Sequence, residues 1–421
     1  MTGRRRVGMF AVLGVAAAFL VVGCGGGGGE EQGGGEAGGG PSATIVSDLP
    51  LQGSARARQE TIANAITLAL EERNYMAGDV QIEYISQDDA TAQAGKWDEA
   101  RCAENAQSAA QNEDVVGWIG PYNSGCAAIE IPILNQAGLG MISPANTYIG
   151  LTKPSPDPSE PEKYYPTGER NYARVIVADN KQGAATAKLM NQQGIESVYV
   201  LDDKETYGKG LADEVQKYAE FLNIEILGRE GIDGSAPNYR SLMNKIKQEN
   251  PDAIYFGGII ENNAGQLVKD KVGAGMSNED VAFIGPDGIY IDTFITQGGT
   301  AAEGSYVTFG GLPPSRLSGE GQEFVEKFEK KHGSVHAYTA YAYEAANVML
   351  DAIERAGEDG EVDREEVIQE IFATENYRGV LGTWSFDDDG DTTLTELSVN
   401  KVVKGQFELD RLLDVEDVVT R

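Results

Sequence analysis

The sequence predicts an α/β fold made of two doubly wound parallel-sheet lobes. Short apolar runs alternate with helical patterns from residue 42 onward, and they do so in two series. A Pro-rich segment, residues 152–169, separates the two series. Strands that alternate with helices pair in parallel, so each series predicts one sheet. With 421 residues, the chain is long enough for two cores of ordinary size.

The first series begins with a helix over residues 59–74, where Ile62, Ile66 and Leu70 recur on one face. The elements expected after it are a strand at 80–86, a helix at 96–111, a strand at 115–120, a helix at 127–138 and a strand at 139–143.

The second series begins near residue 173. Its expected strands are 173–179, 197–203, 224–230, 252–258 and 281–288, and its expected helices are 182–194, 208–223, 238–251 and 263–275.

The charge of the chain excludes one class of partner. The sequence holds 66 acidic and 34 basic residues, a net charge of −32. Nucleic acid is bound through Lys and Arg, so we expect no nucleic-acid partner. Solvated negative faces explain this charge more simply than an acidic docking surface. We expect a monomer without a cofactor.

The N-terminus predicts export. Three arginines, Arg4–Arg6, precede an apolar stretch that ends at Cys24. The sequence Val-Val-Gly-Cys at 21–24 resembles the lipobox of bacterial lipoproteins, which implies that residues 1–24 are a signal peptide and that Cys24 is lipidated. Residues 25–41 then form a Gly-rich tether. The alternative is an uncleaved signal anchor, and in both cases the body lies outside the cytoplasm, anchored to the membrane.

Two further cysteines, Cys102 and Cys126, predict a disulfide, because an even pair in an exported protein is usually bonded. They fall on helical patterns that flank one expected strand, so the fold could bring them together. Two buried free thiols are the alternative.

Candidate ligand-binding residues follow two neighbouring strands. Ser124 lies in "GPYNSG" at the start of a helix, and Ala145 and Thr147 lie in "MISPANT" after the next strand. Parallel sheets bind ligands at these strand ends. A carbonyl, hydroxyl groups and free helix N–H groups together suit a zwitterion, although such residues also serve simply as helix caps.

The segment "VVGWIGPYNSGCAAIEIPILNQAGLGMISPANT" resembles the leucine/isoleucine/valine-binding proteins, the substrate receptors of branched-chain amino-acid ABC transporters. Further similar motifs are "NKQGAATA", "DDKETYGKGLADEVQ", "DAIYFGG", "FIGPDG", "EGSYVT" and "YAYEAANVMLDAIERAG". The resemblance covers about residues 44–410. It implies a type I periplasmic-binding-protein fold, with two lobes joined by three crossovers: 42–173 plus 306–378, and 174–305 plus 379–421.

The resemblance also assigns roles to residues. Ser124 and the N–H of Thr147 would hold the ligand carboxylate. The Ala145 carbonyl, the Thr147 hydroxyl and Asp287 would hold its ammonium, and Tyr207 of the second lobe would cover the ligand on closure.

Two departures from the family concern the side-chain pocket. "GSARARQ" places Arg56 and Arg58 where relatives often have an aromatic residue, and Ile259–Glu261 follow "YFGG" with an apparent insertion. An arginine in the pocket would select an acidic side chain, whereas a solvent-facing arginine would not, and we favour the solvent-facing orientation.

The sequence gives little support to catalysis or metal binding. The only histidines, His332 and His336, are separated by a glycine and lack a zinc motif. Residues 385–396 match EF-hand spacing only in part, and a hairpin turn at Asp389-Gly390 explains them better. No P-loop is present, so a partner ATPase subunit would hydrolyse ATP.

We therefore expect a binding protein and not an enzyme. The first reading is a receptor that delivers an amino acid, branched-chain or related, to an ABC permease. The alternatives are a stand-alone sensory lipoprotein of the same fold and a receptor for an amide or another small polar compound. A sensor usually carries its signalling domain in the same chain, and this sequence contains none, which favours transport.

Overall fold

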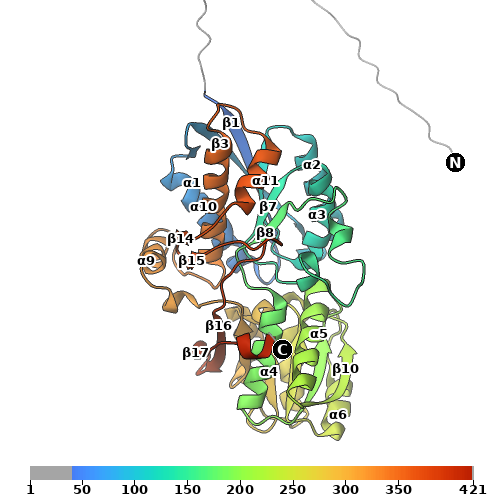
Figure 1. Ribbon diagram of the computed structural model, residues 1–421. Helices are drawn as coiled ribbons and strands as arrows, with labels where there is room; N and C mark the ends of the chain where they lie inside the picture. Colours follow the sequence, from blue (N-terminus) through green and yellow to red (C-terminus); the bar gives the residue numbers. More distant parts are fainter. Residues whose placement is uncertain (1–39, 420–421) are drawn as a thin grey trace, which may run out of the picture. The chain divides into compact units, whose positions relative to one another are not determined.

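The computed structural model describes residues 40–419 (Figure 1). The predicted signal peptide, Cys24 and nearly all of the tether lie outside these described residues. Within residues 40–419, no helix has both the length and the apolar character needed to cross a membrane.

The first lobe is built on a six-stranded sheet with the order β2-β3-β1-β6-β7-β8. Its strands pair in parallel except β2 with β3. Successive residues of a strand face opposite sides, so Ile45 and Val46 enter different cores. The strands are β1 (Ser42–Leu49), β2 (Met76–Ala77), β3 (Val80–Asp88), β6 (Val115–Ile119), β7 (Gly140–Ser143) and β8 (Tyr172–Arg174).

Helices cover both faces of this sheet, as expected for buried parallel strands. Helices α1, α10 and α11 pack on the face of Ile45, whereas α2 and α3 pack on the face of Val46. The helices of this lobe are α1 (Arg56–Glu72), α2 (Glu99–Gln111), α3 (Ser124–Gln136), α9 (Glu320–His332), α10 (Thr339–Ala356) and α11 (Arg364–Phe372).

The second lobe is built on a seven-stranded sheet with the order β10-β9-β11-β12-β13-β16-β17. The strands up to β13 are parallel, and β16 and β17 extend the sheet in antiparallel fashion, which the sequence analysis did not foresee. The strands are β9 (Ser197–Asp202), β10 (Glu225–Gly231), β11 (Ala253–Gly257), β12 (Ala282–Gly285), β13 (Tyr306–Phe309), β16 (Leu397–Val403) and β17 (Gln406–Leu413).

This second sheet is also covered on both faces. Val200 packs with α4, α5 and α12, and its neighbour Leu201 packs with α6, α7 and α8. The helices are α4 (Asp179–Gln192), α5 (Thr206–Phe221), α6 (Arg240–Glu249), α7 (Ala264–Gly273), α8 (Asp292–Gly298) and α12 (Glu416–Val419). In Figure 1 the first lobe occupies the upper half and the second lobe the lower half.

Short elements complete the fold. Two small hairpins are β4 (Ala90–Thr91) with β5 (Lys96–Trp97), and β14 (Tyr377–Gly379) with β15 (Gly382–Trp384). Between residues 40 and 419 there are also six 3-10 turns: η1 (Ile149–Leu151), η2 (Glu162–Tyr164), η3 (Ile260–Asn262), η4 (Asp287–Ile289), η5 (Gly299–Ala302) and η6 (Pro314–Arg316).

The chain crosses between the lobes at places that differ from the expected boundaries. The predicted strand at 173–179 is only β8, and it pairs with β7 in the first sheet. Strand β13 pairs with β12 in the second sheet, so the second crossing follows Phe309 and does not precede residue 306.

The hairpin β14–β15 packs on the first lobe, because Glu344 of α10 accepts a hydrogen bond from the indole of Trp384. The third crossing therefore follows Trp384.

A buried ion pair joins two of these crossings. Arg174, at the end of β8, is fully buried, and its Nε lies 2.7 Å from Oδ1 of Asp391. Asp391 lies between β15 and β16, just after a turn in which the N–H of Gly390 donates to the carbonyl of Asp387. The predicted Asp-Gly turn is therefore present. The attraction of Arg174 keeps the pKa of Asp391 low although burial opposes it.

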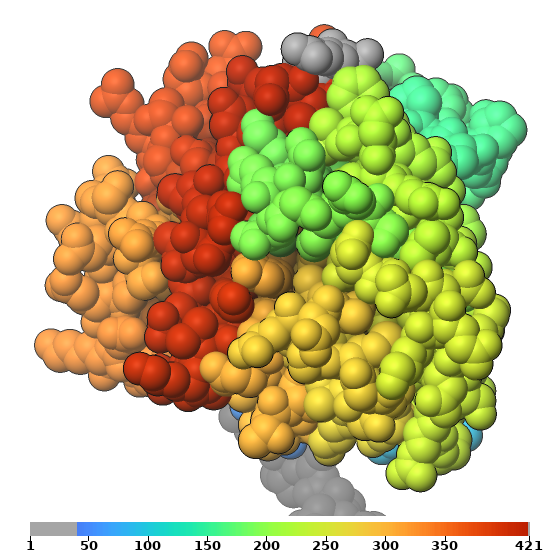
Figure 2. All heavy atoms as spheres, turned by 90° about the horizontal axis from the view of Figure 1, so that it is seen from below, coloured from blue at the N-terminus to red at the C-terminus, as the bar shows by residue number. Residues whose placement is uncertain are grey.

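Figure 2 shows the face on which the C-terminal segment, in red, lies beside segments of the second lobe. A broad hollow of this lobe is lined by residues that include Ile195, Asp252, Tyr306 and Lys401. Asp252 and Tyr306 stand at the amino ends of β11 and β13. This hollow therefore lies at the opposite end of the strands from the predicted ligand-binding residues.

Candidate functional site

Four of the five predicted ligand-binding residues line one small cavity, and Thr147 is not among its lining residues. Ser124 and Ala145 line it from the first lobe, and Tyr207 and Asp287 line it from the second. The cavity is completed by Tyr122, Asn123, Ile259 and Gly288. The fold therefore brings together side chains that are 163 positions apart in the sequence, Ser124 and Asp287.

The turn before α3 is shaped by close approaches that require glycine. Gly120 has φ +135°, and a Cβ there would lie 2.6 Å from the carbonyl oxygen of Asp48. A Cβ on Gly125 would lie 2.4 Å from the indole of Trp97. Strand β6 can therefore turn sharply into α3, and Trp97 covers the start of that helix.

Ser124 begins α3, a helix of 13 residues, so the N–H groups of the first turn have no partner within the helix. The preceding residue, Asn123, gives these groups no side-chain cap. Ser124 Oγ accepts a hydrogen bond from the N–H of Tyr148 at 3.3 Å. The hydroxyl hydrogen of Ser124 and the helix N–H groups are thus available to an anion.

Thr147 is placed one strand further along. Its side chain is 1% exposed, and its Oγ1 has no hydrogen-bond partner within residues 40–419. Its carbonyl accepts a hydrogen bond from the N–H of Asp179, the first residue of α4, at 2.8 Å. Unpaired buried hydroxyls are rare, and the carboxyl of Asp179 is the protein group that interacts with this side chain.

Asp287 is the acidic residue that the second lobe contributes to the wall of the cavity, and its side chain is 3% exposed. Its Oδ1 accepts from Gln182 Nε2 at 2.6 Å and from the Tyr207 hydroxyl at 2.7 Å, and its Oδ2 accepts from the Tyr338 hydroxyl. A carboxylate has about four acceptor positions. One position on Oδ2 therefore remains for a cation.

Asp179 is a second buried acid that the sequence analysis missed. Both of its carboxylate oxygens lack a hydrogen-bond partner in the described chain. Burial raises the pKa of Asp179 well above its usual value, the charge of Asp287 adds to this, and Thr147 and Arg174 partly offset it. An acid directly after an apolar crossing segment was the only available signal for it.

Arg58 contradicts the orientation favoured from the sequence. Its side chain is 1% exposed, and its guanidinium carbon lies 4.8 Å from the ring centre of Tyr122 and 5.9 Å from that of Tyr338. Arg56 is the solvent-facing arginine, paired with Glu60 at 2.6 Å. Helix α1 turns by about 200° over two residues, so the two arginines lie on nearly opposite faces of the helix.

The apparent insertion also reaches the site. Ile259 lines the cavity, Ile260 is buried, and the side chain of Glu261 interacts electrostatically with Arg58. Burial raises the pKa of Glu261, and the charge of Arg58 opposes that rise.

The hairpin β4–β5 makes a second set of contacts between the lobes. Lys96 forms an ion pair with Glu205 of the second lobe, and it also donates to Oδ1 of Asn262 at 2.8 Å. The indole N–H of Trp97 donates to Glu205 at 3.0 Å. These contacts exist only when the lobes are together, and the sequence analysis did not single out any of the four residues.

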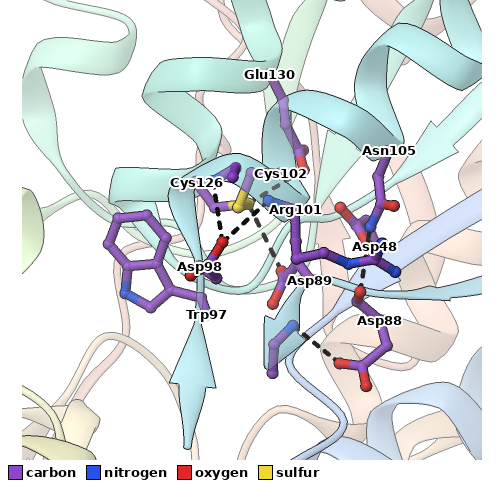
Figure 3. Close-up of a disulfide and its surroundings, with 12 residues drawn as sticks. Asp48, Asp88, Asp89, Trp97, Asp98, Arg101, Cys102, Asn105, Cys126 and Glu130 are labelled. Atoms are coloured by element: carbon purple, nitrogen blue, oxygen red, sulfur yellow. Dashed lines mark hydrogen bonds between the residues drawn. A yellow bond between two sulfur atoms is a disulfide. The ribbon is translucent and has the colours of Figure 1, made fainter. Parts of the chain in front are cut away.

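The predicted disulfide is present between Cys102 of α2 and Cys126 of α3, with their Cα atoms 5.6 Å apart (Figure 3). It fixes the first turn of α3, where Ser124 lies, against α2. Figure 3 shows Asp89 and Glu130 directed toward it. Glu130 Oε1 lies 3.1 Å from the Cys126 sulfur. A disulfide sulfur has no hydrogen, so this contact is a hydrogen bond only when the carboxyl is protonated.

Asp48 completes this buried acidic group. Burial raises its pKa to about 6, while hydrogen bonds with Glu130 and Asn105 limit the rise. Burial also raises the pKa values of Asp89 and Glu130 well above their usual range, and the charge of Asp48 adds to both. The turn before α3 therefore lies beside three buried carboxyls whose ionisation burial disfavours.

Comparison with known proteins assigns the family. A family model described as periplasmic binding protein matches residues 45–406. The chain belongs to the periplasmic binding protein family. Leu/Ile/Val-binding protein homolog 2 of Brucella abortus is 29% identical over 360 residues, which cover 85% of this chain and 89% of that protein.

Solved structures agree with this assignment. A leucine-binding protein from Thermotoga maritima has 26% identity and a TM-score of 0.78, with 89% of this chain and 99% of that chain covered. The isoleucine complex of a branched-chain amino-acid transporter substrate-binding protein from Streptococcus pneumoniae has 22% identity, a TM-score of 0.75 and the same coverage. The resemblance found in the sequence and the type I fold are confirmed, and members of this family are binding proteins.

Proposed function

We propose that this protein is an extracytoplasmic, lipid-anchored receptor that binds an amino acid between its lobes and delivers it to an ABC permease. The observation that carries the proposal is the cavity shared by the two lobes. One wall offers the start of α3 with Ser124, and the other offers the carboxylate of Asp287. The two walls are complementary to the two charges of an α-amino acid.

The carboxylate of the ligand would bind at the first lobe. Ser124 Oγ, the N–H groups of the first turn of α3 and the N–H of Thr147 would donate to it. The ammonium would bind the free acceptor position of Asp287, the Ala145 carbonyl and the Thr147 hydroxyl. An amino acid enclosed in this way loses its water, so both charges need such partners.

Closure of the lobes would follow from binding. Tyr207 lines the cavity and holds Asp287 through a 2.7 Å hydrogen bond, so ligand contacts to these residues exist only when the second lobe meets the first. A ligand that interacts only with the closed state shifts the population toward it. The three crossings are the hinge about which such closure takes place.

The location and partners of the receptor rest on the N-terminal sequence and on the relatives. Lipidation of Cys24 would hold the body at the outer side of the membrane, next to permease subunits, and a separate subunit would hydrolyse ATP. Cys24→Ser should release the protein into the soluble fraction, because it removes every acyl chain. Membrane retention of this variant would contradict the lipid anchor.

The binding proposal is tested by calorimetry of the purified protein against a panel of amino acids, amides and sugars. Asp287→Asn should weaken amino-acid binding by about 2–5 kcal/mol, because the ammonium loses its charged partner. Ser124→Ala should cost about 1–2 kcal/mol, since backbone N–H groups remain. Asp292→Asn, an exposed position five residues further on, is the matched control and should leave binding unchanged.

Tight binding of a sugar, or an Asp287→Asn protein that binds its amino acid as well as the unaltered protein does, would refute the proposed site. Mass spectrometry of the small molecule that copurifies with the protein gives an independent identification.

A further inference from the structure

The guanidinium of Arg58 is buried beside the cavity without a hydrogen-bond acceptor. Its Nε, Nη1 and Nη2 are all buried, and none of them has a hydrogen-bond partner among residues 40–419. A guanidinium has five N–H donors. Leaving all of them unpaired in a buried place is strongly unfavourable, so this side chain is the largest unsatisfied group near the site.

Arg58 lies directly behind one wall of the cavity and is not itself one of the lining residues. It lies over the ring of Tyr122, which is itself a wall of the cavity. It also lies near Tyr338, whose hydroxyl donates to Asp287. When a guanidinium stacks on aromatic faces, its N–H groups point outward from its edge in a planar fork. That fork matches the two oxygens of a carboxylate.

The acids near Arg58 do not satisfy it. Glu261 and Asp287 both attract its charge, but neither lies within 4.0 Å of it in the part of the chain that the structure describes. Asp287 already accepts three hydrogen bonds from protein donors. The nearby His336 is neutral or cationic and offers no anion. Arg58 therefore lacks a counter-ion from the protein itself.

We infer that the bound amino acid carries a carboxylate on its side chain and that Arg58 binds this group. The inference rests on the proposed function and narrows its substrate class. A zwitterion with an aliphatic side chain is neutral and leaves the guanidinium unpaired. An acidic amino acid brings one additional negative charge, which Arg58 balances through a bidentate pair.

The experiment is calorimetry of the purified protein with L-glutamate, L-aspartate, L-glutamine, L-asparagine and L-leucine. One of the two acidic amino acids should bind most tightly. Arg58→Leu should weaken that binding by about 30-fold or more. Arg58→Lys should recover part of the affinity, because it restores the charge without the planar fork. Arg56→Leu, two residues earlier on the same helix, is the matched control and should bind like the unaltered protein.

Glu261→Gln supplies a second, independent variant. Its amide removes a negative charge near the ligand's side chain, so affinity for the acidic amino acid should rise. Circular dichroism and thermal melting of each variant establish that it is folded. The ligand panel on the unaltered protein remains decisive even when Arg58→Leu fails to fold.

The outcomes separate the inference from the proposed function. If leucine binds most tightly and Asp287→Asn abolishes that binding, the amino-acid receptor stands and the role of Arg58 is refuted. If glutamine or asparagine binds most tightly, the requirement for a charged side chain is refuted. If no amino acid binds, the proposed function itself fails.

Discussion

Replacing Asp48 by Asn should make the protein more stable at neutral pH and leave its stability unchanged near pH 4. Asp48 is fully buried, and its Oδ1 accepts a hydrogen bond from Asn105 Nδ2 at 2.8 Å. Asparagine has nearly the same shape, its oxygen can keep this bond, and its amide can donate to Glu130. The substitution therefore removes the charge and little else.

The size of the effect follows from the pKa of Asp48, which is about 6 in the folded protein and 3.8 for an ordinary Asp. In this interval the folded state binds more protons than the unfolded state, so stability falls as pH rises from about 4 through about 6. A difference of about two units corresponds to about 3 kcal/mol. The Asp48→Asn protein does not lose this stability as the pH rises. Above pH 6 its free energy of unfolding should therefore exceed that of the unaltered protein by the same amount.

The assay is urea unfolding of both proteins at pH 4, 5.5 and 7.5. Carboxyls that do not interact with Asp48, such as Glu344 with a pKa of about 7, are common to both proteins and cancel in the difference. Asp89 and Glu130 lose the charge of Asp48 in the variant, so their contribution adds to the gain above pH 6. Asp114→Asn, at an exposed position of the same lobe, is the control and should show no such trend. A difference between Asp48→Asn and the unaltered protein that stays constant with pH would refute the reasoning.

Three further changes test other parts of the structure. Reduction of the disulfide should lower the free energy of unfolding by about 3 kcal/mol on the chain-entropy model, and an unchanged melting temperature would contradict this. Asp391→Asn should destabilise by about 3 kcal/mol, because it removes the only charged partner that the described residues give to the buried guanidinium of Arg174. Asp388→Asn, exposed in the same turn, is the control. Glu205→Gln should weaken ligand binding by at most about fivefold, since the ion pair that it breaks is partly exposed, and an equal affinity at low salt would refute its part in closure.

Most strands and helices between residues 59 and 288 could be predicted from local patterns, whereas β1 and the elements after β12 received no predicted ranges. Apolar runs and helical spacing are local properties, so the predicted bounds of the elements around Ser124 and Thr147 lie close to the observed bounds. The exact crossings could not be predicted in the same way. The run Ala173–Asp179 has a strand-like apolar centre at residues 175–178, yet only its first residues pair with β7, because pairing depends on where the neighbouring strand ends. Strand β13 joins the second sheet for the same reason.

The state of Arg58 depends on residues far away in the sequence, and this is why the sequence favoured the wrong orientation. Both arginines of "GSARARQ" lie on the first turn of α1, and only the facing of that helix separates them. Tyr338, which flanks Arg58, comes 280 positions later and lies next to α10. Asp287, which Tyr338 contacts, belongs to the other lobe. Arg58 is thus buried by a later segment of the first lobe and by the neighbouring second lobe. The sequence of α1 contains no pattern that indicates either contact. Whether a residue of α1 comes to lie beside the cavity is therefore decided by the tertiary fold and not by its neighbours in the sequence.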